Sequence, residues 1–179
     1  MARYVAFLRA INVGGHVVKM TVLKKHFEEL GFSGVETVLA SGNVVFDSPS
    51  RSASALEQKV AGHLEKRLGY GVATFLRRPE ELLRVTGHRP FERAELEAEG
   101  HTLFVGFHGR EADAAARRRV LALTSEIDAF RLRGREVFWL CRARVTDSKV
   151  YGGGLEKALG QPATLRNVTT VRRIAEKYA

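Results

Sequence analysis

Apolar positions in the first third of the chain switch between strand-like and helix-like spacing. Residues 3–11, RYVAFLRAI, form a run rich in β-branched and aromatic side chains, which is typical of a buried strand. Leu23, Phe27 and Leu30 then follow the i, i+4, i+7 spacing of one helix face. The pattern predicts a strand and then a helix, with Thr21 as the residue that caps the helix.

The alternation between strand-like and helix-like spacing of apolar residues continues as far as residue 78. Three further apolar runs, each short and bounded by turn residues, predict strands at 35–40, 44–48 and 72–78. A helical stripe from Leu56 to Leu68 lies between the last two of these runs, and Gly69 follows it. The resulting order, β-α-β-β-α-β, is that of a ferredoxin-like fold.

This order of elements brings particular loops together. Right-handed crossovers place the first and third strands side by side at the centre of the sheet. The exit of the first strand (12–19), the start of the first helix and the turn at 41–43 are therefore expected at one end of the sheet.

The second half begins with the same pattern. A strand is predicted at 101–107, a helix at 111–125, and a hairpin at 127–142 that turns at Gly134–Arg135. Two helical stretches follow, and the last of them carries Val168, Val171, Ile174 and Tyr178 on one face. The pattern shows no closing strand, so the second half is interpreted as a partial βαββα repeat with C-terminal helices.

These elements predict an α+β fold with two subdomains. The polar segment 87–100 is interpreted as a connector between a ferredoxin-like subdomain at 1–86 and a second α+β subdomain at 101–179.

Composition narrows the class of protein. The chain has 29 Lys and Arg against 20 Asp and Glu, a net charge of +9, which favours anionic partners such as nucleic acid. An arginine-rich surface without a partner is the alternative explanation of this charge.

Cys141 is the only cysteine, so an intrachain disulfide is excluded. No apolar run approaches the roughly 20 residues that cross a bilayer. We therefore expect a cytoplasmic protein that does not enter a membrane.

A glycine-containing segment after the first strand is the first candidate binding site. Gly14 and Gly15 permit positive φ or a close backbone approach, and the segment leads to a helix start, where exposed N–H groups attract anions. Asn12 and Lys19 flank the glycines. The spacing matches neither the G-x-G-x-x-G nor the P-loop motif, so a tight strand-to-helix turn is the alternative.

Two other segments offer polar groups. Ser41 and Asn43 flank a hairpin glycine that the predicted topology places beside the first candidate segment, although a simple turn explains them equally well. Arg166 and Asn167 precede the final helix. Asn167 is a suitable N-cap for that helix. Arg166 is interpreted either as a partner in a salt bridge or as a residue whose guanidinium binds phosphate or carboxylate through two hydrogen bonds.

Other chemistry has little support in the sequence. The histidines follow no metal-binding spacing, so no metal and no cofactor are expected. Cys141 lies in a strand pattern beside Trp139 and is interpreted as a buried, inert thiol. Tyr4 and Phe7 have the odd spacing that puts them on opposite strand faces, which argues against the stacking platform of an RNA-recognition module.

Three stretches together resemble one known family. They are YVAFLRAINVGG (4–15), SGNVVFDS (41–48) and LEKALGQPATLRNVTTVRRIA (155–175). In this order and at these separations they are similar to the bacterial domain-of-unknown-function family DUF1697. The resemblance implies an α+β protein of two subdomains, the first ferredoxin-like, and it implies no reaction.

The leading functional hypothesis is a protein that binds an anionic ligand, either a phosphorylated small molecule or nucleic acid. One alternative is an enzyme that acts on a phosphorylated or carboxylated small molecule, with His16 or Arg166 assisting. The other alternative is a protein-interaction module whose sheet edges pair with a partner.

Overall fold

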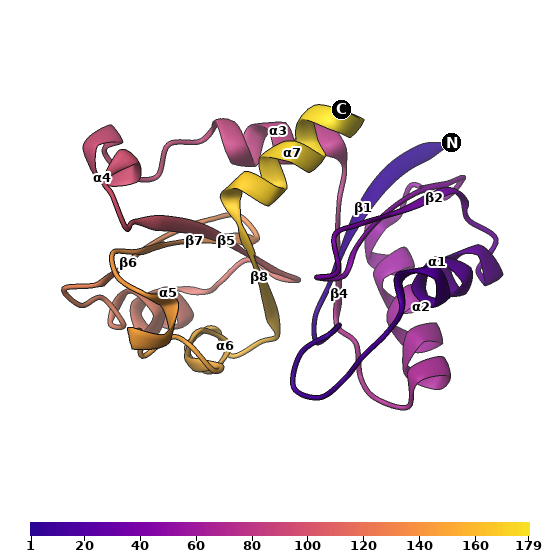
Figure 1. Ribbon diagram of the computed structural model, residues 1–179, viewed down its shortest axis with the longest axis horizontal. Helices are drawn as coiled ribbons and strands as arrows, with labels where there is room; N and C mark the ends of the chain where they lie inside the picture. The colour runs from indigo at the N-terminus through magenta and orange to yellow at the C-terminus, as the bar shows by residue number, and fades with distance from the viewer. The chain divides into compact units, whose positions relative to one another are not determined.

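The computed structural model describes residues 1–179, which form two compact units (Figure 1). Residues 1–83 and 177–179 make up the first unit, and residues 84–176 make up the second. The segment predicted as a connector, 87–100, groups with the second unit and contains a short helix, α4 (Arg93–Glu97). No helix has the length and apolar character needed to span a membrane.

The first unit is a four-stranded antiparallel sheet with two helices. Its strands and helices are β1 (Ala2–Leu8), α1 (Met20–Glu29), β2 (Ser33–Val38), β3 (Asn43–Ser48), α2 (Ala53–Leu68) and β4 (Thr74–Arg77). The strand order is β2-β3-β1-β4, so the first and third strands are central. The predicted ferredoxin-like arrangement is confirmed.

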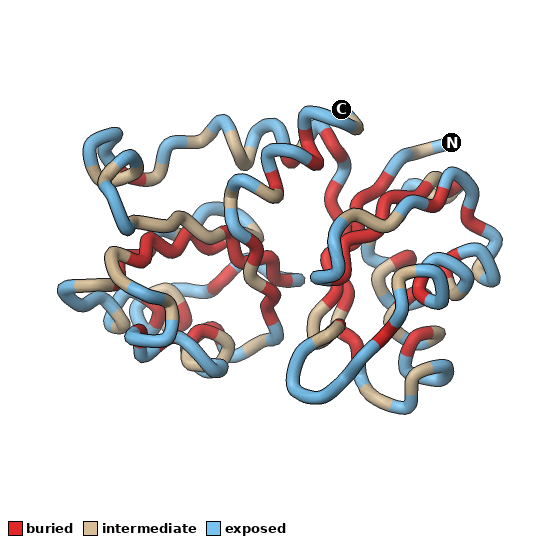
Figure 2. The backbone as a smooth tube through the Cα atoms, in the orientation of Figure 1, coloured by how far each residue is buried: buried red, intermediate tan, exposed pale blue.

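Both helices pack on one face of this sheet. Leu23 and Phe27 of α1 and the inner stripe of α2 join Tyr4, Ala6 and Leu8 of β1 in a single buried cluster. Alternate residues of a strand point to opposite faces, so Phe7 lies on the other face, as its spacing from Tyr4 predicts. Figure 2 shows that β1, β3 and β4 are mostly buried, whereas buried and exposed residues alternate along both helices.

The second unit repeats the same topology. Helix α3 (Pro79–Gly87) leads into it, and its other elements are α4, β5 (Thr102–His108), α5 (Ala114–Leu121), β6 (Asp128–Arg133), β7 (Glu136–Cys141), a 3₁₀ turn (Val145–Asp147), α6 (Gly154–Leu159), β8 (Ala163–Asn167) and α7 (Val168–Tyr178). The strand order is β6-β7-β5-β8, which matches that of the first sheet. Cys141 is buried in its core, as predicted, and Trp139 and Phe130 belong to the same core.

The prediction that the second half lacks a closing strand is wrong. Strand β8 pairs antiparallel with β5, with Arg166 opposite Val105, and it completes a second βαββαβ unit. The strand has only five residues, ATLRN, and runs directly into α7. Its apolar alternation is limited to Ala163 and Leu165, which is too short for a period to stand out from the sequence alone.

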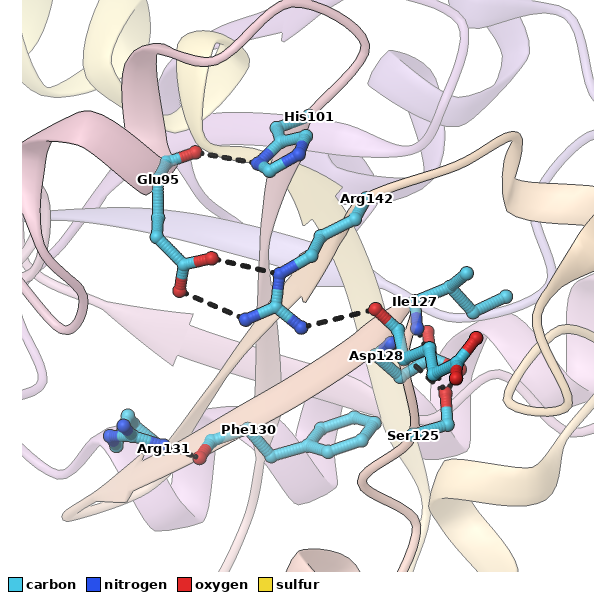
Figure 3. Close-up of polar contacts among 9 residues, drawn as sticks. Glu95, His101, Ser125, Ile127, Asp128, Phe130, Arg131 and Arg142 are labelled. Carbon is cyan, nitrogen blue, oxygen red and sulfur yellow. Dashed lines mark hydrogen bonds and ion pairs between the residues drawn. The ribbon is translucent and has the colours of Figure 1, made fainter.

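An ion pair attaches α4 to the end of β7. Arg142 donates from Nε and Nη2 to the two carboxylate oxygens of Glu95, each at 2.9 Å, as Figure 3 shows. The hydrogen bonds from Arg142 lower the pKa of Glu95 from its ordinary value near 4.5. A bidentate pair of this kind fixes the orientation of both side chains.

We expect Glu95→Gln to lower the melting temperature at pH 7 and to have little effect in acid. A carboxylate whose pKa is lowered by folding stabilises the protein above its unfolded pKa and loses that contribution as the pH falls through its folded pKa. Melting curves of both proteins should therefore converge as the pH falls from 4.5 through the lowered pKa of Glu95 in the folded protein. Glu97→Gln is the control, because Glu97 pairs with Arg93 on the exposed side of the same helix. A Glu95→Gln effect that is equal at both pH values would contradict the role of this ion pair.

Candidate functional site

Three segments meet at one end of the first sheet, and the topology predicted this position for two of them, the exit of the first strand and the turn after the second. The backbone N–H of Leu8 donates to the carbonyl of Gly42 at 2.9 Å, and that of Arg9 donates to the carbonyl of Ala73 at 2.9 Å. These bonds bring together the segment after β1 (9–19), the β2–β3 turn (39–42) and the segment before β4 (69–73). In Figure 1 the first of these is the indigo loop that leads from β1 to α1.

The side chain of Asn12 fixes the segment after β1 against the β2–β3 turn. Its Nδ2 donates to the carbonyl of Ala40 at 2.8 Å, and its Oδ1 accepts from the backbone N–H of Val18 at 2.7 Å. Its φ of 56° lies in the left-handed region, which asparagine tolerates better than most residues. The amide of Asn12 therefore joins the loop to the β2–β3 turn and sets the path of the residues between.

Asn43 supports the turn from inside the protein. It is fully buried, and its Nδ2 donates to the carbonyl of Val38 at 2.9 Å and to Oγ of Ser41 at 3.0 Å. Ser41 itself is exposed. The predicted turn is confirmed, and its glycine, Gly42, has a φ of 86°.

The glycine pair is exposed at this end of the sheet. Gly14 and Gly15 have φ values of 58° and 84°, and no atom lies within 4 Å of where a Cβ would be at either position. His16 follows them, and its ring stacks on Tyr70 with a centroid separation of 3.7 Å. The two glycines therefore present their backbone to solvent next to an aromatic pair, which the sequence pattern did not reveal.

Helix α1 begins differently from the prediction. Its N-cap is Lys19, with no side-chain cap, and not Thr21, which lies inside the helix. The carbonyl of Lys19 accepts from the backbone N–H groups of Val22 and Leu23, each at 3.0 Å. Helices α2 and α5, by contrast, are capped by the side chains of Ser52 and Asp113. The first turn of α1 therefore contains no carboxylate that would offset the positive end of the helix dipole. Its one hydroxyl is that of Thr21, which does not cap the helix.

Together, the three segments at this end of the sheet contain basic residues and no acidic residue. The first 27 residues contain five Lys and Arg and no Asp or Glu. The other two segments at this end, 39–42 and 69–73, also contain no acidic residue. Lys19 is exposed. An anion near Gly14 and Gly15 would therefore meet backbone N–H groups, a helix N-terminus and a lysine.

The other predicted pair, Arg166 and Asn167, lies in the second unit. Arg166 is buried in β8, and its Nη1 donates to Oγ1 of Thr164 at 2.6 Å and to the carbonyl of Leu165 at 3.0 Å. Burial lowers the pKa of its guanidinium to about 10. Oδ1 of Asn167 accepts from the backbone N–H of Thr169 at 2.9 Å, which confirms that it caps α7.

Arg166 has a counterpart in the first unit. Arg77 in β4 lies opposite Val5 of β1, as Arg166 in β8 lies opposite Val105 of β5. Arg77 is also buried, and its Nη1 donates to the carbonyl of the preceding residue, Leu76, at 2.8 Å. The shared position and the shared bond indicate that this arginine belongs to the architecture of the repeated unit.

Comparison with known proteins agrees with the predicted resemblance. The sequence profile of the family described as "Protein of unknown function (DUF1697)" matches residues 1–138, a range that includes the first two stretches on which the resemblance rests. No curated protein matches the chain. The solved structure of the conserved bacterial protein SP0830 from Streptococcus pneumoniae has the same fold, with a TM-score of 0.70 and 22% identity over 99% of this chain and 98% of that one. The chain therefore belongs to the DUF1697 family of proteins of unknown function.

Proposed function

We propose that this protein binds an anionic ligand, through its phosphate or carboxylate group, at the loop formed by Gly14, Gly15 and Lys19. The observation that carries the proposal is the start of α1, where a lysine occupies the N-cap position and no side chain caps the helix. Asn12, Ser41 and Asn43 take part by holding the loop and the turn in place.

Electrostatics support this choice of ligand. A helix N-terminus carries a partial positive charge, and a cation placed there opposes the dipole. Lys19 therefore costs α1 some stability while the site is empty, and a bound anion would offset both the lysine and the dipole. The exposed glycines let a ligand approach the backbone N–H groups without meeting a side chain.

Tyr70 adds a further polar group near the loop. Its ring lies against His16, and its buried hydroxyl has no hydrogen-bond partner. Burial raises the pKa of Tyr70, which keeps the hydroxyl protonated and able to donate. An unpaired buried donor is costly, so a ligand atom that accepted from it would gain a favourable contact.

Substitution of Lys19 separates this proposal from general attraction to a basic surface. We expect Lys19→Asp to raise the melting temperature of the ligand-free protein, because an aspartate N-cap stabilises a helix by roughly 1 kcal/mol. The same change should abolish binding of inorganic phosphate, nucleotides and short oligonucleotides. Binding is measured by calorimetry and by the ligand-induced shift in melting temperature at two salt concentrations.

Two variants that each replace a lysine by an uncharged glutamine provide the control. Lys19→Gln and Lys25→Gln each remove one positive charge from α1, and both lysines are exposed. Lys19→Gln should weaken binding by about 2- to 5-fold, the range of a single charge at a helix end, and Lys25→Gln by less. Equal weakening by both variants, with loss of all binding at high salt, would refute the site and leave only a basic surface. Selective binding of a nucleotide over an oligonucleotide would identify a small molecule as the ligand.

A further inference from the structure

We propose that His26, Glu29 and His63 form a binding site for a divalent transition-metal ion, and that zinc is the ion best suited to it. The three side chains come from the last turns of α1 and from the middle of α2. One ring nitrogen of His26, one ring nitrogen of His63 and a carboxylate oxygen of Glu29 all lie within 4.8 Å of one another. This site is separate from the proposed anion site, which lies at the opposite end of α1.

The geometry of the cluster is close to that of a metal site. Both imidazoles approach the same oxygen, Oε2 of Glu29, with His26 Nδ1 at 3.3 Å and His63 Nε2 at 3.0 Å. Zinc bonds of 2.0–2.1 Å in a tetrahedron place neighbouring ligand atoms roughly 3.3 Å apart. Both nitrogen–oxygen distances are therefore already close to the separation of two atoms that bind the same ion.

The helices hold these side chains before any ion binds. His26 and Glu29 are three residues apart on α1, which puts them on the same helix face. The side chains of His26 and His63 are only 12% and 17% exposed. The His26 and His63 rings meet edge to face at 5.8 Å. Little side-chain freedom is left to lose on binding, which favours affinity.

The charge state of the cluster also suits a cation. Hydrogen bonds from His26 and His63 lower the pKa of Glu29, so the carboxylate is ionised at neutral pH. The cluster lies at the C-terminal end of α1, where the helix dipole attracts positive charge. Two imidazoles and one carboxylate, with a fourth position open to water, are a ligand set found in zinc enzymes.

Arg67 competes with the metal ion for the carboxylate of Glu29. Its Nε lies 3.2 Å from Oε2 of Glu29, the same oxygen that would bind the metal. The Arg67 side chain is 52% exposed, so it can turn into solvent when an ion binds. In the present hydrogen bonds the imidazole nitrogens of His26 and His63 each face a carboxylate, which only accepts, so metal binding requires the tautomer with the proton on the opposite ring nitrogen.

Zinc binding to the untagged 179-residue chain tests the proposal. Isothermal titration with zinc should give one site per chain, and cobalt should give the visible spectrum of a four-coordinate ion. His26→Gln and His63→Gln should each weaken zinc binding by about 100-fold, because a direct ligand matters at least as much as the outer partners whose loss costs roughly 10- to 100-fold. His88→Gln, a histidine outside the cluster, should leave binding unchanged.

Arg67→Gln provides a variant with the opposite expected effect. Removal of the competing cation should tighten zinc binding by several-fold, whereas a cluster held only by hydrogen bonds would show no zinc affinity to increase. Circular dichroism checks that each variant is folded. The proposal is overturned if the natural protein binds no zinc, or if its zinc binding survives in a folded His26→Gln, His63→Gln double variant.

Discussion

Replacement of Gly42 by alanine is expected to lower the free energy of unfolding by about 2–4 kcal/mol. Gly42 lies in the β2–β3 turn with a φ of 86°, a conformation that alanine adopts only with strain. A Cβ at this position would lie 2.9 Å from Cβ of Ile11 and 3.3 Å from Cβ of Leu8. The contact is with inflexible parts of buried side chains, so the turn and the loop would have to move apart.

The expected loss of stability in Gly42→Ala has two sources, backbone strain at positive φ and the close contact of the new Cβ with Ile11. A substitution at a second glycine separates them. Gly31, just after α1, has a φ of 84°, and no atom lies within 4 Å of the position that a Cβ would occupy there. Gly31→Ala should therefore show the backbone strain alone, about 1 kcal/mol. Urea unfolding of the two variants measures the difference. Equal losses would mean that the approach of Ile11 to Gly42 contributes nothing, and that the loop is not fixed against the turn.

Asp128→Ala is expected to destabilise the protein by about 3–5 kcal/mol. Asp128 is 1% exposed and accepts from Nε1 of Trp139 at 2.7 Å and from Oγ of Ser148 at 2.8 Å. Oγ of Ser125 donates to the same carboxylate at 3.3 Å, as Figure 3 shows. Truncation would leave the buried indole N–H and the Ser148 hydroxyl without their acceptor, and each orphaned donor costs roughly 1–3 kcal/mol.

A second aspartate in the same unit is the matched control. Asp113 caps α5 by accepting from the backbone N–H of Ala116 at 2.8 Å, and it lies at the surface. Asp113→Ala should cost only about 1 kcal/mol, the typical value of an N-cap. Chemical denaturation followed by Trp139 fluorescence measures both variants, since Trp139 is the only tryptophan. A similar loss in the two variants would show that the buried network adds little to stability.

Local patterns were sufficient to predict most of the first unit. Residues 3–11 form one apolar run, and Leu23 and Phe27 keep helical spacing, so each element is visible within a window of about a dozen residues. The order of elements then left few topologies to consider. The same reasoning failed at β8, because the pairing with β5 that makes this five-residue segment a strand is not a local property.

The candidate anion site was predicted in position but not in detail. The order of elements placed the loop, the turn and the helix start at one end of the sheet, and the backbone hydrogen bond from Leu8 to Gly42 agrees. It did not foresee that Lys19, and not Thr21, begins α1, or that Tyr70 stacks on His16. A helix boundary depends on the path of the chain before it, here set by the Asn12 hydrogen bonds.

The His26, Glu29 and His63 cluster could not be predicted from spacing. Two of its members belong to α1 and the third to α2, and only the packing of both helices on one face of the sheet brings them together. Hydrophobic periodicity is local, because it reflects which face of each element is buried, and so the sequence by itself determined the elements of the first unit and their ferredoxin-like order. Contacts between polar side chains depend on helix rotation and register, which arise only when the elements pack.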